Sequence, residues 1–97
     1  MYATHLDAVF FSNRSACWLE LGQKKRALVD AEQCRKLRPE WAKACFRMAT
    51  ARLALERYED AAVAAFEGLK LDDENYELKK IMKKAIAMGR KENSKSK

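Results

Sequence analysis

Apolar residues recur every three or four positions along most of the chain, which is the spacing of a buried face on an α-helix. In segments 24–37 and 58–71 small residues occupy this face. They are Ala27, Ala31 and Cys34 in the first segment and Ala61, Ala65 and Gly68 in the second. Such a stripe lets two helices approach closely, and larger side chains can fill the space around it. The larger side chains available are Phe11, Trp18, Leu28, Met48, Leu55, Tyr58 and Leu69.

Helix-ending residues and polar clusters divide this pattern into five predicted helices. Their predicted bounds are 8–21, 24–37, 40–55, 58–71 and about 74–90. Gly22 suits the end of the first helix, and Pro39 cannot continue the second. A short turn at Glu56 and Arg57 separates the third helix from the fourth, and a polar cluster at 72–75 precedes the fifth. The predicted fold class is all-α.

The helices repeat with a period of 34 residues, so that residues 8–41 and 42–75 each form a two-helix hairpin. Identical residues at this offset include the pairs Ala8 and Ala42, Leu19 and Leu53, Leu21 and Leu55, Ala27 and Ala61, and Ala31 and Ala65. The fifth helix has one apolar face, formed by Leu78, Ile81, Met82, Ala85 and Ile86, with four lysines off it.

The 34-residue helical hairpin resembles the tetratricopeptide repeat (TPR). It has glycine at its turn, alanine early in its second helix and proline after that helix. The first hairpin matches through Phe11, Ser15, Trp18, Gly22, Ala27 and Pro39, and the second through Ala49, Tyr58, Ala61 and Gly68. The second hairpin departs from the motif at three positions, where Arg52, Glu56 and Asp73 replace an apolar residue, the glycine and the proline. The resemblance implies a right-handed superhelical array closed by a capping helix over 74–91.

On this basis the chain divides into a lead-in at 1–7, one TPR domain at 8–91 and a disordered basic tail at 92–97.

The chain has 20 basic and 14 acidic residues, and eight of the basic ones lie in 79–97 against a single acid, Glu92. We interpret this basic end as a solvated cap and tail. The alternative is an electrostatic site for nucleic acid or an acidic membrane surface. Because no aromatic residue alternates with these lysines and only Tyr76 lies close to them in sequence, nucleic acid is not the expected partner.

Several classes of function have no support in the sequence. No apolar run approaches the eighteen or so residues of a membrane span, and residues 1–6 lack the features of a signal peptide, so we expect a soluble, cytoplasmic protein, with the nucleus as the alternative. The three cysteines, Cys17, Cys34 and Cys45, have no paired short spacing and are predicted to be buried thiols. We therefore expect no disulfide framework, no metal site and no cofactor.

Catalytic chemistry is not expected either. The chain has no glycine-rich phosphate loop, and its one histidine, His5, lies in the lead-in that we expect to fray. Ser12 and Ser15 have no histidine at a useful spacing and are predicted to be serines of a helix surface. We predict that the protein is not an enzyme.

The TPR resemblance implies a concave groove lined by the first helix of each hairpin. Its second and sixth positions, which point into the groove, are Val9 and Asn13 in the first hairpin and Lys43 and Arg47 in the second. Lys43 and Arg47 are neighbours on one helix face, where two like charges cost about 0.2–0.5 kcal/mol. Asn13 and Arg47 are 34 residues apart and hence equivalent on adjacent helices. Three polar groups are thus predicted to converge.

The segments FSNRSACWLELG and WAKACFR are similar to the carboxylate-clamp subfamily of TPR domains. This subfamily is found in co-chaperones that bind the Glu-Glu-Val-Asp tails of heat-shock chaperones. The resemblance implies that Asn13, Lys43 and Arg47 bind the carboxylates of such a tail. The phrase RPEWAKACFR also resembles the TPR module of plant ankyrin-repeat TPR proteins. The alternative is a structural scaffold that binds an unrelated protein by shape, through Phe46, Thr50 and Leu53.

The clamp of this subfamily also uses a lysine and an asparagine from one repeat upstream, where this chain has only MYATHLD. We therefore expect two repeats and a cap cut from a longer protein. If a complete clamp binds its peptide with a dissociation constant of about 1 μM, the loss of two contacts weakens binding roughly a hundredfold, to a dissociation constant of about 100 μM. Phe10, Phe11 and Leu28 are expected near an uncovered N-terminal face, through which the chain could form a homodimer by helix exchange.

Overall fold

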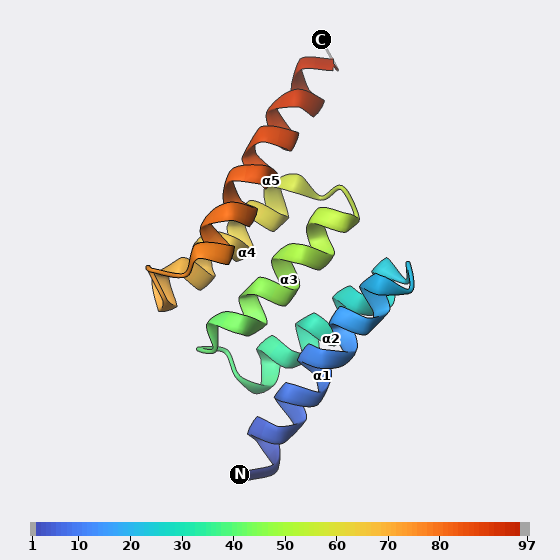
Figure 1. The fold of residues 1–97 in the computed structure, drawn as a ribbon, viewed down its shortest axis with the longest axis vertical. Coiled ribbons are helices and arrows are strands. Elements are labelled where there is room, and N and C mark those ends of the chain that lie inside the picture. The colour runs from blue at the N-terminus through green and yellow to red at the C-terminus, as the bar shows by residue number, and fades with distance from the viewer. Residues whose placement is uncertain (1, 96–97) are drawn as a thin grey trace.

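Residues 2–95, the part of the chain that the computed structural model describes, form five helices and no strand (Figure 1). The helices are α1 (Tyr2–Glu20), α2 (Lys24–Leu37), α3 (Ala42–Ala54), α4 (Tyr58–Leu71) and α5 (Tyr76–Lys95). Helices α1 and α2 form one hairpin, α3 and α4 form the next, and α5 packs against α4. The predicted all-α fold of two helical hairpins and a fifth helix is confirmed.

The helices are arranged in two layers that differ in how closely their members approach. In one layer the backbone of α3 lies close to those of α1 and α5, whereas the backbones of α2 and α4 lie farther apart and an ion pair of 2.9 Å between Nη1 of Arg35 and Oε1 of Glu67 joins them. A double layer that is tighter on one side curves toward that side, as in other solenoids. Helices α1, α3 and α5 therefore form the concave face. The molecule measures 50 × 30 × 18 Å, with α1 and α5 toward opposite ends of its long axis (Figure 1).

Both hairpins turn in the same way, although only the first has a glycine at the turn. Gly22 has a φ of +78°, and Glu56, which is 34 residues later, has a φ of +62°. The amide of Gly22 donates to the carbonyl of Leu19 and that of Glu56 to the carbonyl of Leu53, each at 3.0 Å. Glu56 thus adopts a left-handed conformation that glycine takes at no steric cost. Glutamate in place of glycine at this position therefore preserves the turn but adds backbone strain.

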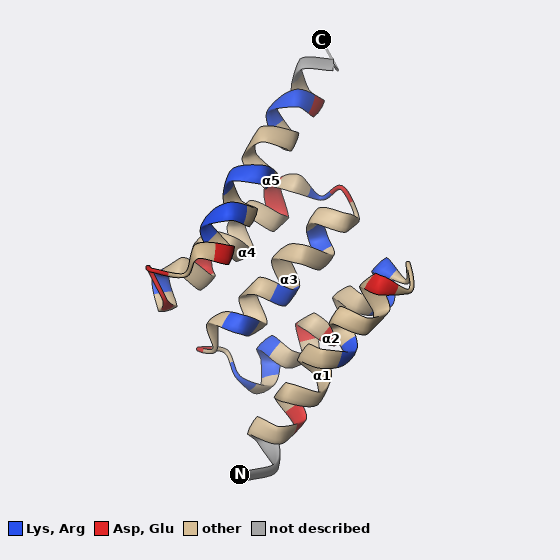
Figure 2. Ribbon diagram, in the orientation of Figure 1, with Lys and Arg blue, Asp and Glu red and all other residues tan. Residues whose placement is uncertain are grey.

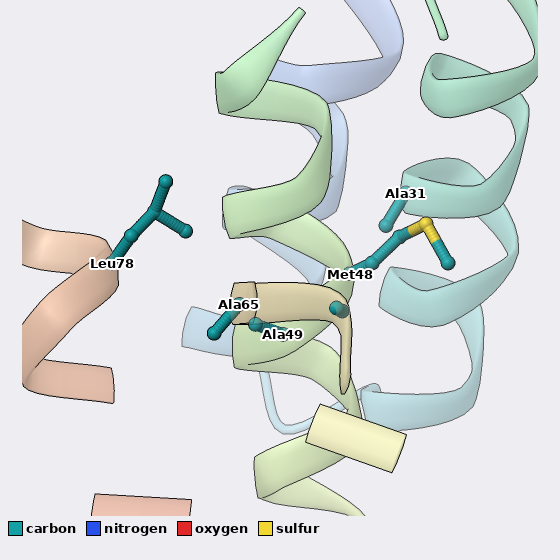
Figure 3. Close-up of a cluster of buried hydrophobic side chains, with 6 residues drawn as sticks. Ala31, Met48, Ala49, Ala65 and Leu78 are labelled. Carbon is teal, nitrogen blue, oxygen red and sulfur yellow. The ribbon is translucent and has the colours of Figure 1, made fainter. Parts of the chain in front are cut away.

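The interior consists largely of alanine, which brings the helices close together. The central cluster contains Ala31, Met48, Ala49, Ala64, Ala65 and Leu78. In Figure 3, Leu78 extends from α5 toward Ala65 and Ala49, and Met48 extends from α3 toward Ala31. All six residues of the predicted small-residue stripe are buried. The closest approach is at Gly68, where an added Cβ would lie 2.8 Å from Cδ1 of Leu78 and 2.9 Å from Cβ of Cys45.

A buried carboxylate stabilises the first hairpin in addition to this apolar packing. Asp30 is 3% exposed. It accepts hydrogen bonds from Nε of Arg14 at 2.7 Å, from Nη2 of Arg14 at 3.0 Å and from Nε1 of Trp18 at 2.8 Å. The sequence pattern identified Trp18 as a packing residue but did not identify Asp30, because an acidic residue in a helix is usually exposed.

The predictions for both ends of the chain were wrong within the described residues. The lead-in was expected to fray, but residues 2–7 are helical, and the ring of His5 lies 5.5 Å from that of Trp41. Nη1 of Arg38 also donates to Nδ1 of His5. At the other end α5 continues to Lys95, through most of the tail that was predicted to be disordered from residue 92. Residues 96 and 97 lie outside the described residues.

These differences have simple physical causes. Contacts with the loop before α3 stabilise the first turns of α1. In α5 the lysine, arginine and glutamate residues favour helix, and a single glycine costs only about 1 kcal/mol. The third helix begins at Ala42 instead of residue 40, because Trp41 adopts an extended conformation with φ −94° and ψ 112°.

The predicted exposure of three side chains, those of Ser12, Ser15 and Cys17, was also wrong. Ser12 and Ser15 were expected on a helix surface, but they are 1% and 0% exposed. The hydroxyl of Ser15 donates to the carbonyl of Ala27 at 2.8 Å, which satisfies it between α1 and α2. Cys17 was expected to be buried but is exposed, because no helix of the described part covers that side of α1. Leu28 packs with Ala27 and is 8% exposed, as expected of a residue that fills the space around the small-residue stripe.

Candidate functional site

The predicted site residues Asn13, Lys43 and Arg47 lie on α1 and α3, two neighbouring helices of the concave face. A hydrogen bond of 3.0 Å from Nε of Arg47 to Oγ of Ser12 joins these helices beside Asn13. Asn13 and Lys43 are exposed, and Arg47 is half-buried. Among the side chains that the structure describes, those of residues 5–93, neither the amide of Asn13 nor the ammonium group of Lys43 has a hydrogen-bond or ion-pair partner. Both are therefore available to a ligand.

Arg47 has an unusual environment for a cation. Burial lowers the pKa of its guanidinium group, while the thiol of Cys34 and the carboxylate of Glu77 act in the opposite direction. The group is nevertheless charged at neutral pH, as arginine always is in proteins. Within the described residues no carboxylate lies within 4.0 Å of it. A partly desolvated charge that has no carboxylate at ion-pair distance is unfavourable, and an incoming anion would relieve this cost.

The contacts of Arg47 also fix the direction of its free donors. The hydrogen bond to Ser12 uses Nε, and the guanidinium carbon lies 5.6 Å from the centre of the Phe46 ring. Nη1 and Nη2 have no hydrogen-bond partner in the described part of the chain, so they can donate to the two oxygens of a carboxylate. Figure 2 shows that basic residues recur along α3 and α5. The site is thus preorganised and electropositive.

Comparison with known proteins places this geometry in a family, although no family model matches the chain. The Hsp70-Hsp90 organizing protein 1 of Glycine max is 42% identical over 72 residues, which are 74% of this chain and 13% of that protein. Protein STIP1 homolog of Dictyostelium discoideum is 38% identical over 77 residues, 79% of this chain and 14% of that protein. The chain therefore spans less than a quarter of the length of these relatives.

Solved structures agree with these relatives. The first TPR of Spaghetti (RPAP3), bound to the HSP90 peptide SRMEEVD, has a TM-score of 0.78 and 26% identity, over 82% of this chain and 64% of that one. The TPR2B domain of yeast Sti1, in complex with an Hsp70 peptide, has a TM-score of 0.77 and 26% identity, over 84% of this chain and 70% of that one. This chain is a TPR domain of the co-chaperone type. The predicted family is confirmed.

The other predicted groove residues of this TPR domain have different surroundings. Val9 is half-buried on α1. Thr50 is half-buried on α3, and its hydroxyl donates to the carbonyl of Arg47 at 2.9 Å. Phe46 and Leu53, both half-buried on α3, line a cavity of about 240 Å³ between α3 and α5. The groove of the TPR domain therefore has a polar part beside Arg47 and an apolar part beside α5.

Sequence reasoning missed two components of this TPR groove. Ser12, which orients Arg47, was classed as a surface serine, although it directly precedes Asn13. The contribution of α5 was also missed, because the fifth helix was treated only as a cap. A signal was present, since Ile81 follows Arg47 by the same 34 residues that separate Arg47 from Asn13.

The described residues give no indication of two other kinds of site. In residues 2–95 no helix combines the length and the apolar character needed to cross a bilayer. No group of three or more histidine, cysteine or acidic side chains in that range could hold a metal ion.

Proposed function

We propose that this TPR domain binds peptides that end in an acidic residue with a free carboxylate, of the kind found at the C-termini of heat-shock chaperones, in the cytoplasm. Asn13, Lys43 and Arg47 hold the carboxylates. The observation that carries this proposal is the half-buried guanidinium group of Arg47, which Ser12 orients and which has no carboxylate partner within residues 2–95. The HSP90 and Hsp70 peptides bound to the TPR domains of Spaghetti and Sti1 support the choice of ligand.

The three side chains can together bind the carboxylate at the C-terminus of a peptide. A terminal carboxylate has two oxygens, which can accept from the free Nη atoms of Arg47 and from Nζ of Lys43, while the amide of Asn13 donates to the remaining lone pairs. Hydrogen bonds to charged groups contribute about 1.5–3 kcal/mol each. One such bond outweighs the repulsion of about 0.2–0.5 kcal/mol between Lys43 and Arg47.

The test is a titration of the isotope-labelled 97-residue chain with a peptide that ends in Glu-Glu-Val-Asp, followed by NMR. We expect a dissociation constant of about 100 μM or weaker. The same peptide with an amidated C-terminus should bind at least tenfold more weakly, because it lacks the terminal charge. The double variant Lys43→Ala/Arg47→Ala should abolish detectable binding.

The matched control is Lys24→Ala/Lys36→Ala, which removes the same charge from exposed positions on α2. This control should bind the peptide as the native chain does at moderate salt. Equal weakening by the two double variants would show that net charge alone attracts the peptide. Unchanged binding to the Lys43→Ala/Arg47→Ala variant would contradict the proposed site.

One observation favours the alternative function, a scaffold that self-associates. Leu6 and Phe10 on α1, and Leu21 directly after it, are 68%, 53% and 69% exposed. Ala44, which is equivalent to Phe10 in the second hairpin, is fully buried. Sedimentation velocity over a range of concentrations should detect a dimer that Phe10→Ser weakens and Val29→Ser, on exposed α2 surface, does not. A monomer at all concentrations would argue against self-association.

A further inference from the structure

One side of α5 carries five exposed cations, which together form the basic face of this helix. They are Lys79, Lys80, Lys83, Arg90 and Lys91. Lys83 and Arg90 follow Lys79 by four and eleven residues, and Lys91 follows Lys80 by eleven, which are spacings that keep side chains on one face of a helix. With a rise of about 1.5 Å per residue, the basic face is about 18 Å long. Figure 2 shows the basic bands that recur along α5.

The basic face points away from the rest of the domain. The opposite side of α5 packs against the preceding helices through the buried residues Leu78 and Ala85. The two acidic residues of α5 lie off the basic face, because Glu77 lines the cavity beside α3 and Glu92 lines a cavity at the turn before α4. The final turns of α5 also extend beyond α3 and α4 (Figure 1). A large, flat partner can therefore approach the basic face.

The charges of this face are not neutralised within the domain. Among the side chains of residues 5–93, Lys79 forms one ion pair, in which its Nζ lies 3.7 Å from Oε2 of the exposed residue Glu74. In that same range the other four cations have no carboxylate within 4.0 Å. A surface that only has to be soluble usually mixes charges of both signs. The single sign of this face therefore indicates an anionic partner.

The residues around the cations distinguish between two kinds of anionic partner. Tyr76 is 70% exposed on the basic face, and its ring centre lies 5.4 Å from Nζ of Lys80. Ile86 and Met88, at the edges of the face, are 39% and 36% exposed. A helix that lies on a bilayer combines such apolar groups with lysines that attract anionic lipids. Nucleic acids are recognised through several stacking rings or base-reading side chains, and this face has one ring and one arginine.

We propose that the basic face of α5 binds the surface of a membrane that contains anionic phospholipids, with the helix axis parallel to that surface. The five cations interact with the anionic headgroups, and the ring of Tyr76 enters the headgroup layer, where tyrosine is favoured. The concave groove lies on another side of α5, so the site at Arg47 stays accessible to a peptide. This inference goes beyond the proposed function and does not depend on it.

The test is co-sedimentation of the 97-residue chain with vesicles of phosphatidylcholine and phosphatidylserine in a ratio of about two to one. We expect binding that weakens steeply as the salt concentration rises, and no binding to vesicles of phosphatidylcholine alone. Lys83→Gln/Lys91→Gln should weaken binding roughly tenfold or more, because each cation near an anionic surface contributes about fivefold. The matched control Lys24→Gln/Lys36→Gln, on exposed α2 surface, should change the affinity less than about twofold.

A further variant and two competitors separate the membrane from other anions. Tyr76→Ser leaves the net charge unchanged and should weaken vesicle binding about threefold, since it removes exposed apolar area. A duplex DNA oligonucleotide and inorganic phosphate, each at the phosphate concentration of the vesicles, should displace less than half of the bound chain.

Several outcomes would overturn the proposal. Failure to bind the phosphatidylserine vesicles, or equal weakening by the two double variants, would show that the basic face does not bind membranes. Full displacement by the duplex would identify nucleic acid as the partner, and full displacement by phosphate would show only general anion binding. Unchanged binding of Tyr76→Ser would refute the insertion of its ring. Circular dichroism of each variant shows whether the fold is retained.

Discussion

Replacing Gly68 by alanine tests the close packing that gives this domain its shape. An added Cβ would lie 2.8 Å and 3.1 Å from the two methyl groups of Leu78 and 2.9 Å from Cβ of Cys45. The Leu78 methyls can rotate away, but the Cβ of Cys45 is fixed by the backbone of α3. Helices α3 and α4 must therefore separate, and overpacking of this kind costs about 1–3 kcal/mol.

Alanine also gains about 1 kcal/mol over glycine as a helix former, so this gain must be separated from the packing cost. Gly89→Ala provides the control, because Gly89 also lies within a helix and its added Cβ would meet only Cβ of Tyr58, at an ordinary 3.5 Å. We expect Gly89→Ala to raise the melting temperature and Gly68→Ala to lower it. For a domain of this size 1 kcal/mol corresponds to about 4–8 °C.

The assay is thermal unfolding followed by circular dichroism at 222 nm, with urea unfolding to obtain free energies. The difference between the two variants measures the packing cost alone, because the helix-forming gain cancels. The reasoning would be refuted if Gly68→Ala raised the melting temperature as much as Gly89→Ala does. That result would mean that α3 and α4 are not in close contact at this point.

Three further predictions concern the turn, the buried carboxylate and the thiols. Glu56→Gly should raise the free energy of unfolding in urea by up to about 1 kcal/mol, because it removes left-handed strain. Asp30→Ala should lower that free energy by about 2–3 kcal/mol, because the indole N–H of the half-buried Trp18 loses its acceptor and the charge-assisted pair with Arg14 is lost; a change below about 0.5 kcal/mol would contradict this. Iodoacetamide should modify Cys17 in the folded protein, and Cys34 and Cys45 only after unfolding. Burial raises the pKa of both these thiols, so their contribution to the free energy of unfolding should be constant below about pH 8.5 and fall above it, where the unfolded chain ionises first.

The helices could be predicted from sequence because each depends on a local pattern. The second and fourth helices begin and end where predicted, at 24–37 and 58–71, since their stripes of small residues are uninterrupted. The errors occurred at the ends of the chain, where structure depends on distant contacts. The first turns of α1 are ordered by contact of His5 with Trp41, which no local pattern reveals.

The positions of the candidate site could also be predicted, but not their environment. The 34-residue offset relates Asn13 to Arg47, and the structure has them on adjacent helices. The offset does not reveal that a serine hydroxyl orients Arg47, nor that the guanidinium group is half-buried. Both depend on how closely α1 approaches α3, which the alanine-rich interior determines. Burial of the site is therefore a consequence of packing across the whole domain.

The proximity of Lys43 and Arg47 illustrates this dependence. On an isolated helix the pair would only be repulsive, by about 0.2–0.5 kcal/mol. In the folded domain Arg47 is tethered to Ser12 at 3.0 Å and flanked by the Phe46 ring, so it cannot move away from Lys43 into solvent without losing these contacts. A carboxylate that reaches both side chains would attract both cations, so the position in which the fold holds Arg47 favours the binding of an anion beside Lys43.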